Sequence, residues 1–239
     1  LKHRLMLRCK VLGIIGLGNV GSRVARVGAK LGMTVLANDP PLARRGRKGL
    51  AGLSELLAQS DFVSLHVPLE RGGDFPTDHL AGADFLRQLK PAAFLLNSSR
   101  GEVVDGAALK TALRSGRLAG AVLDVWEDEP AIDIELLKLV DYGTPHIAGY
   151  SADGKANGTA AAVRFVAKIF GVEALAGFYP AGLPARPRVA EPLPEEELAR
   201  LAHIADTYYD IRIDDAALRA APGRFEELRN GYRDRREAP

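Results

Sequence analysis

Cysteine, long apolar runs and an excess of charge of one sign are all scarce in this sequence, and each shortage narrows the class of protein. Cys9 is the single cysteine, so no disulfide can form within the chain. With no signal-like segment at its start, we expect a cytoplasmic protein. The longest apolar stretches fall short of the roughly 20 residues that a membrane-spanning helix needs. The net charge of +2 argues neither for nor against nucleic acid, and we expect neither nucleic acid nor a membrane as a partner.

What the sequence has instead is a regular alternation of short apolar runs and helical patterns. The runs are bounded by Gly, Pro and Asp, which is typical of buried parallel strands joined by right-handed crossovers. The pattern therefore predicts an α/β fold with a Rossmann-type, doubly wound parallel sheet. We expect its strands at Val11–Ile15, Thr34–Ala37, Phe62–His66, Ala93–Asn97, Gly120–Asp124 and Val140–Thr144.

The composition changes after a long alanine-rich helix that we predict at Gly154–Phe170. Residues 177–194 contain five prolines and two glycines, which is typical of a linker. Charged helical patterns follow it. We therefore divide the chain into a sheet domain (1–175), a linker (176–194) and a small α-rich segment (195–239).

A glycine pattern follows the first predicted strand and opens the first predicted helix. Its first glycine permits a tight turn, its second lets the backbone approach a pyrophosphate, and its third allows close packing of helix on strand. The pyrophosphate charge suits the helix N-terminus. We expect dinucleotide contacts from Gly16, Gly18, Asn19, Val20 and Gly21.

Asp39 closes the second predicted strand and favours NAD over NADP. A carboxylate there can accept hydrogen bonds from the ribose hydroxyls of the adenosine and would repel a 2′-phosphate. The plainer interpretation is that Asp39 starts a turn with Pro40 and Pro41, and both can hold together. Nearby Arg44, Arg45 and Arg47 weaken the preference for NAD slightly, because an arginine can accommodate a 2′-phosphate.

Three polar residues, Arg100, Glu129 and His146, each follow a different predicted strand. Parallel strands end at one edge of such a sheet, and ligands bind in the crevice outside that edge. An arginine can hold a carboxylate through two parallel hydrogen bonds, and a histidine can move a proton near neutral pH. A nearby glutamate fixes its tautomer and favours its charged form. The trio therefore predicts a site for a 2-hydroxy or 2-oxo acid, although a lone histidine would more often be structural. His66, at another strand end, is a second candidate for the acid/base, but we expect it to pack near the cofactor.

Three segments that contain this trio, 96–105, 123–130 and 144–149, occur in a fixed order after the glycine pattern. Together they resemble the D-isomer-specific 2-hydroxyacid dehydrogenases over about residues 11–170. The resemblance implies that Arg100 binds the substrate carboxylate, that His146 is the acid/base and that Glu129 supports it. It also implies NAD as the cofactor, with further contacts from Val67, Ser98, Asp124 and Gly149.

Two features resemble the family member that oxidises 4-phospho-D-erythronate in vitamin B6 synthesis. Tyr150 matches a substrate-contacting position, and residues 210–233 resemble part of its extra C-terminal dimerisation domain. We therefore expect a small phosphorylated hydroxy acid as substrate and a homodimer as the assembly. The apolar positions Leu198, Leu201, Ile204 and Tyr208 mark one helical stripe, which must pack on the sheet domain or on a second chain.

Some parts of that family pattern are missing from the sequence. The N-terminal substrate lobe is almost absent and the first residue is Leu, so we expect a fragment that lacks its true N-terminus. The alternatives are another family member, acting on phosphoglycerate, glyoxylate or hydroxypyruvate, and an NAD-sensing binding module without turnover. We expect no metal at the site.

Overall fold

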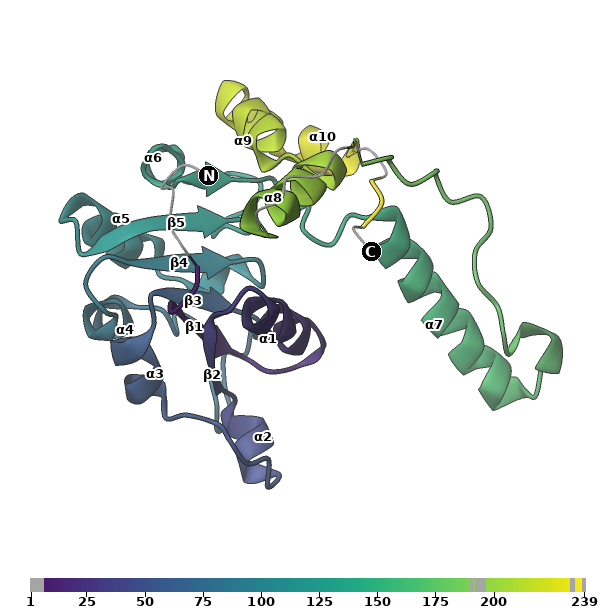
Figure 1. Cartoon of the computed structure of the whole chain (residues 1–239), viewed down its shortest axis with the longest axis horizontal. Coiled ribbons are helices and arrows are strands. Elements are labelled where there is room, and N and C mark those ends of the chain that lie inside the picture. Colours follow the sequence, from purple (N-terminus) through teal and green to yellow (C-terminus); the bar gives the residue numbers. More distant parts are fainter. Residues whose placement is uncertain (1–6, 190, 192–196, 233–234, 238–239) are drawn as a thin grey trace.

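The computed structural model describes residues 7–189, 191, 197–232 and 235–237, and a parallel β-sheet forms its centre (Figure 1). Within these residues six strands lie in the order β2-β1-β3-β4-β5-β6, and every neighbouring pair is parallel. The chain changes direction across the sheet between β1 and β3, which makes the crevice there the expected ligand site. The predicted fold is confirmed. The strands are β1 (Val11–Ile15), β2 (Thr34–Asn38), β3 (Phe62–Leu65), β4 (Ala93–Asn97), β5 (Leu118–Leu123) and β6 (Tyr142–Gly143).

Helices cover both faces of the sheet. On one face the side chain of Leu12 in β1 meets Gly28 of α1; on the other, Gly13 lies against Leu56 of α3. The core on the α3 side extends under α4, α5 and α6. The helices are α1 (Asn19–Lys30), α2 (Pro40–Arg44), α3 (Leu53–Gln59), α4 (Ala83–Gln88), α5 (Gly106–Arg114), α6 (Ile134–Leu139), α7 (Ala152–Phe170), α8 (Glu197–Tyr208), α9 (Ile211–Ala220) and α10 (Phe225–Asn230).

The structure departs from the predicted elements in two instructive places. The strand β6 is shorter than expected because Val140 ends α6 as its C-cap. The short helix α2 was not predicted, because two prolines in succession resemble a turn; here Asp39 caps the helix and a proline occupies its first turn.

The helix α7 projects away from the sheet domain, and an extended segment returns from its far end (Figure 1). Ser151 caps its start, and Gly171, with φ of +67°, ends it. Phe165 and Phe170 near its far end are 65% and 74% exposed. Among the described residues, even so, no helix combines the length and apolar character needed to cross a membrane.

The helices α9 and α10 pack back onto the sheet domain. Leu218 and Phe225 are buried in the same core as the sheet. Asp215 accepts a hydrogen bond from the backbone N–H of Gly143 in β6 at 2.7 Å. The structure thus places α9 and α10 on their own sheet domain, whereas the division into domains and the dimer stay predictions. Of the predicted stripe, the side chains of Leu198, Leu201 and Ile204 lie outside the described residues.

Candidate active site

The turn after β1 has the geometry that a dinucleotide requires. Gly16 has φ of +88°, and a Cβ there would lie 2.5 Å from the carbonyl oxygen of His66. A Cβ on Gly21 would lie 2.0 Å from the carbonyl oxygen of Gly16, so this glycine lets α1 pack against the turn. Around Gly18, in contrast, the space is open. Gly18 and the exposed N-terminus of α1, at Asn19 and Val20, therefore leave room for a pyrophosphate.

A pocket of about 540 Å³ lies beside this turn. Gly16, Gly18, Asp39, His66 and Val67 are among the residues that line it. Burial holds the pKa of His66 below its usual value, and its Nε2 lies 2.9 Å from the hydroxyl of Ser64. His66 therefore lines this pocket as a neutral side chain.

Asp39 acts at this pocket both as a cap and as a carboxylate facing the cofactor space. Its Oδ2 accepts a hydrogen bond from Leu17 N at 2.8 Å, and its Oδ1 accepts one from Leu42 N at 2.9 Å. The two bonds fix the carboxylate between the glycine turn and α2. The side chain of Arg44 has other partners than this carboxylate: it pairs with Asp74 and lies over the ring of Phe75.

His146 and Glu129 form a hydrogen-bonded pair at the carboxyl edge of the sheet. His146 Nδ1 lies 2.7 Å from Glu129 Oε2, and the two side chains are 27% and 18% exposed. Glu129 Oε1 accepts a second bond from Trp126 N at 2.9 Å. Because the carboxylate accepts, Nδ1 carries the proton, and Nε2 is left as an acceptor.

The backbone around His146 is held in an unusual conformation by Asp124. His146 has φ of +57°, a conformation that costs on the order of 1–3 kcal/mol for a residue other than glycine. The buried carboxylate of Asp124 accepts bonds from Ile147 N at 2.8 Å, Ala148 N at 2.9 Å and the hydroxyl of Thr144 at 2.6 Å. These charge-assisted bonds offset the strain and aim the imidazole.

Arg100 follows β4 at the same edge and is exposed. Its Nη1 donates to Ser99 O at 2.6 Å. A Cβ on the next residue, Gly101, would lie 1.9 Å from Trp126 O. The loop of Arg100 therefore touches the loop of Glu129, and any residue larger than glycine would push the two apart.

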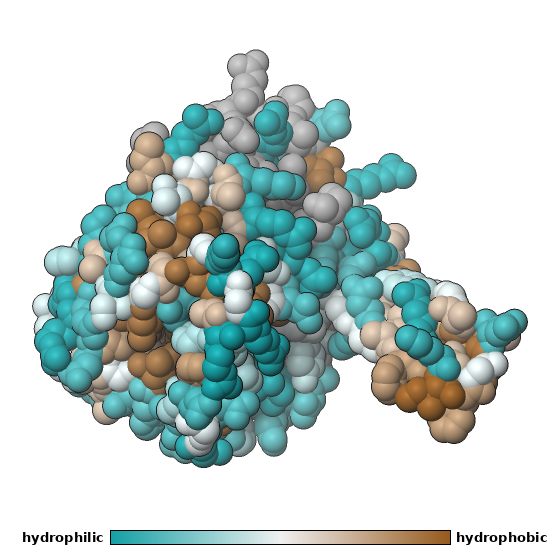
Figure 2. All heavy atoms as spheres, turned by 90° about the horizontal axis from the view of Figure 1, so that it is seen from below, coloured by the Kyte–Doolittle hydropathy of each residue, from teal (hydrophilic) through white to brown (hydrophobic). Residues whose placement is uncertain are grey.

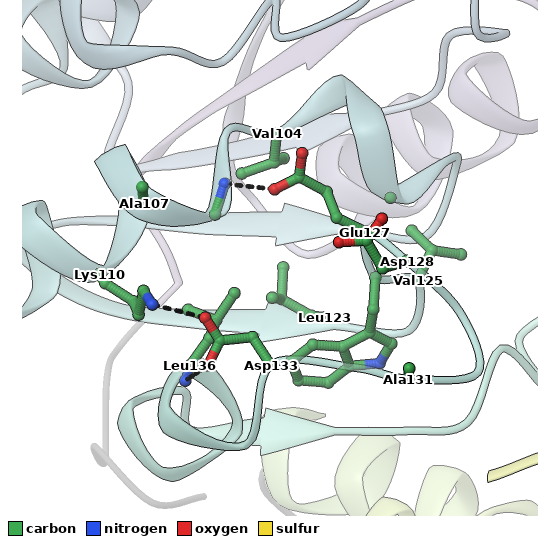
Figure 3. A pocket seen from close by; sticks show the side chains of 13 residues that line it. Val104, Ala107, Lys110, Leu123, Val125, Glu127, Asp128, Ala131, Asp133 and Leu136 are labelled. Atoms are coloured by element: carbon green, nitrogen blue, oxygen red, sulfur yellow. Dashed lines mark hydrogen bonds and ion pairs between the residues drawn. The ribbon is translucent and has the colours of Figure 1, made fainter.

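The loop of Glu129 is braced on its other side by Glu127 (Figure 3). Glu127 Oε2 accepts a hydrogen bond from Gly106 N at 2.7 Å, and its Oε1 lies 2.6 Å from His79 Nε2. The hydrogen bond to Glu127 raises the pKa of His79. Beneath these contacts lies a pocket of about 190 Å³, at whose rim Lys110 pairs with Asp133 at 2.5 Å.

The remaining predicted residues lie around this edge. Ser98 follows β4 and Gly149 follows the His146 loop, and both are exposed. Tyr150 is half-buried; the guanidinium of Arg229 is 5.9 Å, and Nζ of Lys155 5.4 Å, from its ring centre. Among the described residues, no three His, Cys, Asp or Glu side chains converge as a metal site.

Sequence reasoning missed two arginines of the C-terminal segment. Arg229 Nη1 lies 3.8 Å from Glu129 Oε2, and Arg235 Nη2 donates to Ile147 O at 3.4 Å and Ala148 O at 3.2 Å. Both lie more than eighty residues beyond the loops that they touch. No local motif marks them in a segment rich in arginine.

Comparison with known proteins agrees with this geometry. The family model described as D-isomer specific 2-hydroxyacid dehydrogenase, NAD binding domain, matches residues 2–148. A second family, described as a domain of unknown function (DUF3410), matches residues 188–239. Erythronate-4-phosphate dehydrogenase of Escherichia coli O17:K52:H18 (strain UMN026 / ExPEC) is 45% identical over 97% of this chain and 62% of its own length. The chain thus spans about three-fifths of the curated relatives that it matches.

Solved structures of dehydrogenases also resemble the chain. D-lactate dehydrogenase from Aquifex aeolicus, in complex with NAD and lactic acid, has a TM-score of 0.57 at 34% identity, covering 74% of this chain and 58% of that one. NAD-dependent formate dehydrogenase from Staphylococcus aureus, in complex with NAD, has a TM-score of 0.55 at 32% identity, covering 62% and 44%. The family resemblance and NAD as the cofactor are therefore confirmed.

Proposed function

Since the chain belongs to the family of D-isomer specific 2-hydroxyacid dehydrogenases, we propose that the protein oxidises 4-phospho-D-erythronate with NAD. The product would be (R)-3-hydroxy-2-oxo-4-phosphooxybutanoate, an intermediate of pyridoxine 5′-phosphate synthesis. The observation that carries a dehydrogenase function is the His146–Glu129 hydrogen bond of 2.7 Å at the same edge of the parallel sheet as the glycine turn after β1. The 45% identity to an erythronate-4-phosphate dehydrogenase, which extends over 97% of this chain, supports the choice of substrate.

Each residue of the trio has one task in this proposal. Arg100 grips the substrate carboxylate through parallel hydrogen bonds and so fixes C2. His146 Nε2 accepts the proton of the C2 hydroxyl, while Glu129 stabilises the imidazolium that forms. NAD, when bound, accepts the hydride that leaves C2 as the carbonyl forms. The reverse reaction returns the same proton from His146 to the 2-oxo acid.

The other predicted contacts surround these groups. Tyr150 would face the substrate, because it follows the His146 loop directly. Gly16, Gly18, Asn19, Val20 and Gly21 would hold the pyrophosphate, and Asp39 the adenosine ribose. We propose the remaining cofactor contacts at Val67, Ser98, Asp124 and Gly149.

A substrate panel tests the proposed reaction. Formation of NADH would be followed by its absorbance, using the full-length protein with 4-phospho-D-erythronate, D-3-phosphoglycerate, D-glycerate and glycolate. We expect the highest kcat/KM with 4-phospho-D-erythronate. A higher value with another acid would reject this substrate, and NAD binding without any turnover would point to a sensing module instead.

We further propose that the protein is a cytoplasmic homodimer whose C-terminal segment supplies the interface. Ile213 on α9 is 53% exposed although its helix is otherwise anchored in the core. Apolar atoms also gather on the lobe that α7 forms (Figure 2). Light scattering should give the mass of two chains, and Ile213→Asp should give the mass of one. Val27→Asp, at an equally exposed residue of α1, serves as the control and should remain a dimer.

A truncation before Pro194 would be a poor test of this interface. Removing α9 and α10 would expose Leu218 and Phe225, which are 0% and 1% exposed in the folded chain. The shortened chain would then lose part of its core. If the folded Ile213→Asp variant still had the mass of two chains in light scattering, the proposed interface would be refuted.

A further inference from the structure

The C-terminal segment places one charged side chain against the acid/base pair. Arg229 lies in the last turn of α10, and its Nη1 is 3.8 Å from Glu129 Oε2. The same oxygen lies 2.7 Å from His146 Nδ1. Glu129 therefore lies between the catalytic imidazole and a guanidinium contributed from a distant part of the chain.

The helix that carries Arg229 is held in place by packing against the sheet domain. Phe225, one turn earlier in α10, is buried in the core of the sheet domain, and Leu228 packs against that core. Tyr232, just after the helix, donates its hydroxyl hydrogen to Asp214 in α9 at 3.0 Å. With both ends of α10 held, the backbone of Arg229 stays within reach of Glu129.

Three groups now act on the Glu129 carboxylate. The backbone N–H of Trp126 binds Oε1, while His146 and Arg229 converge on Oε2. A glutamate side chain has three rotatable bonds, so its carboxylate can turn unless the groups around it hold it in place. A cation behind Oε2 opposes that turning, because the carboxylate is only 18% exposed and its attraction to the guanidinium is weakly screened.

We propose that Arg229 is a positioning residue, which acts through Glu129 to hold His146 in its working tautomer and orientation. This inference rests on the proposed function. It gives the C-terminal segment, whose family is described as a domain of unknown function, a part in the site of its own chain. The contact is one of charge at 3.8 Å rather than a bidentate pair, so a lysine should replace the arginine in part.

Kinetics of the full-length protein provide the first test. Arg229→Gln should lower kcat on the order of 10- to 100-fold, since a displacement of about 1 Å at a catalytic group can cost about 10²-fold. The KM for NAD should stay within about twofold of the original value, and Arg229→Lys should recover part of kcat. Arg224→Gln is the matched control, because Arg224 lies just before α10 and pairs with exposed Glu227. An unchanged kcat, or a rise in substrate KM alone, would overturn the inference.

A second readout does not depend on turnover. In this 239-residue chain, two-bond ¹H–¹⁵N spectra of the His146 ring should show the proton on Nδ1. Arg229→Gln should weaken this signal through exchange between tautomers, whereas Arg229→Lys and Arg224→Gln should keep it. An identical signal in the Gln variant would overturn the positioning role even if no hydroxy acid were turned over, so the failure of this inference and that of the proposed function are distinguishable.

Discussion

The cofactor turn after β1 and the acid/base loop before α7 occupy the same edge of the sheet but are built by different means. The cofactor turn is made of backbone: it needs Gly16 for its φ of +88° and Gly21 for its close approach to the turn. The acid/base loop depends on side chains, since Asp124 accepts three hydrogen bonds to hold His146 at φ of +57°. A local sequence motif can encode the first but not the second.

The difference also shows in where the supporting residues come from. The described residues that shape the cofactor turn and line its pocket all lie before residue 81. The acid/base loop, in contrast, draws on β5 through Asp124 and on the C-terminal segment through Arg229 and Arg235. Substitutions should therefore separate cofactor binding from proton transfer.

Replacing His146 should produce the largest effect and leave the cofactor turn untouched. His146→Ala removes the proton acceptor and should lower kcat about 10²- to 10⁴-fold. Calorimetry should show an NAD affinity within about twofold of the original value. His203→Ala, which makes the same change on α8, should leave kcat nearly unchanged. A His146→Ala variant of normal turnover would remove this histidine from the mechanism.

Two alanine substitutions in the cofactor turn should have opposite consequences. In Gly21→Ala the new Cβ meets Gly16 O at 2.0 Å, so the free energy of unfolding should fall by roughly 1–3 kcal/mol. In Gly18→Ala the Cβ meets nothing within 4 Å, so stability should hold while the NAD affinity falls. Urea denaturation and calorimetry measure the two effects. Normal NAD binding by Gly18→Ala would place the pyrophosphate elsewhere.

Substitutions of Asp39 should distinguish the effect of its charge on NAD binding from its effect on the stability of the fold. Asp39→Ala loses the acceptor for Leu17 N and Leu42 N and should cost about 0.5–2 kcal/mol of stability as a lost helix cap. Asp39→Asn can keep one of these bonds but removes the charge. Both variants should weaken NAD binding and narrow its advantage over NADP. Calorimetry with both nucleotides decides, and an unchanged ratio would contradict the ribose assignment.

The smallest expected effect is the pH dependence of the contacts that hold the C-terminal tail near the acid/base loop. Hydrogen bonds from Arg236, aided by the backbone of Glu237, lower the pKa of Asp153 to about 2. Because this pKa lies below the unfolded value of 3.8, the pair stabilises the fold above that value, and the contribution is lost as the pH falls towards 2. The stability difference between the native chain and Asp153→Asn should therefore shrink over this range in urea titrations.

Asp84→Asn is the control for that titration. Asp84 pairs with Arg87 on the surface and is 81% exposed, so its loss should change stability little at any pH. A native-minus-variant difference for Asp153 that stayed constant down to pH 2 would show that the pair does not titrate as proposed.

Much of the fold was predictable because its signals are local. Apolar runs bounded by turn residues located β1 and β4 to the residue. The helix α2 was not predicted because the same residues, Asp39 and two prolines, can also form a turn. Only the neighbouring contacts decide between these conformations.

The sequence by itself determined the sheet, the glycine turn and the identity of the trio Arg100, Glu129 and His146, since strand periodicity and fixed spacing are properties of short segments. The tertiary structure alone decided how those residues are held. Gly101 brings two loops into contact, Asp124 bends the backbone of His146, and Arg229 reaches Glu129 from 100 residues further along the chain. The Arg229 contact follows from the packing of α9 and α10 onto the core, and no spacing along the sequence encodes any of the three contacts.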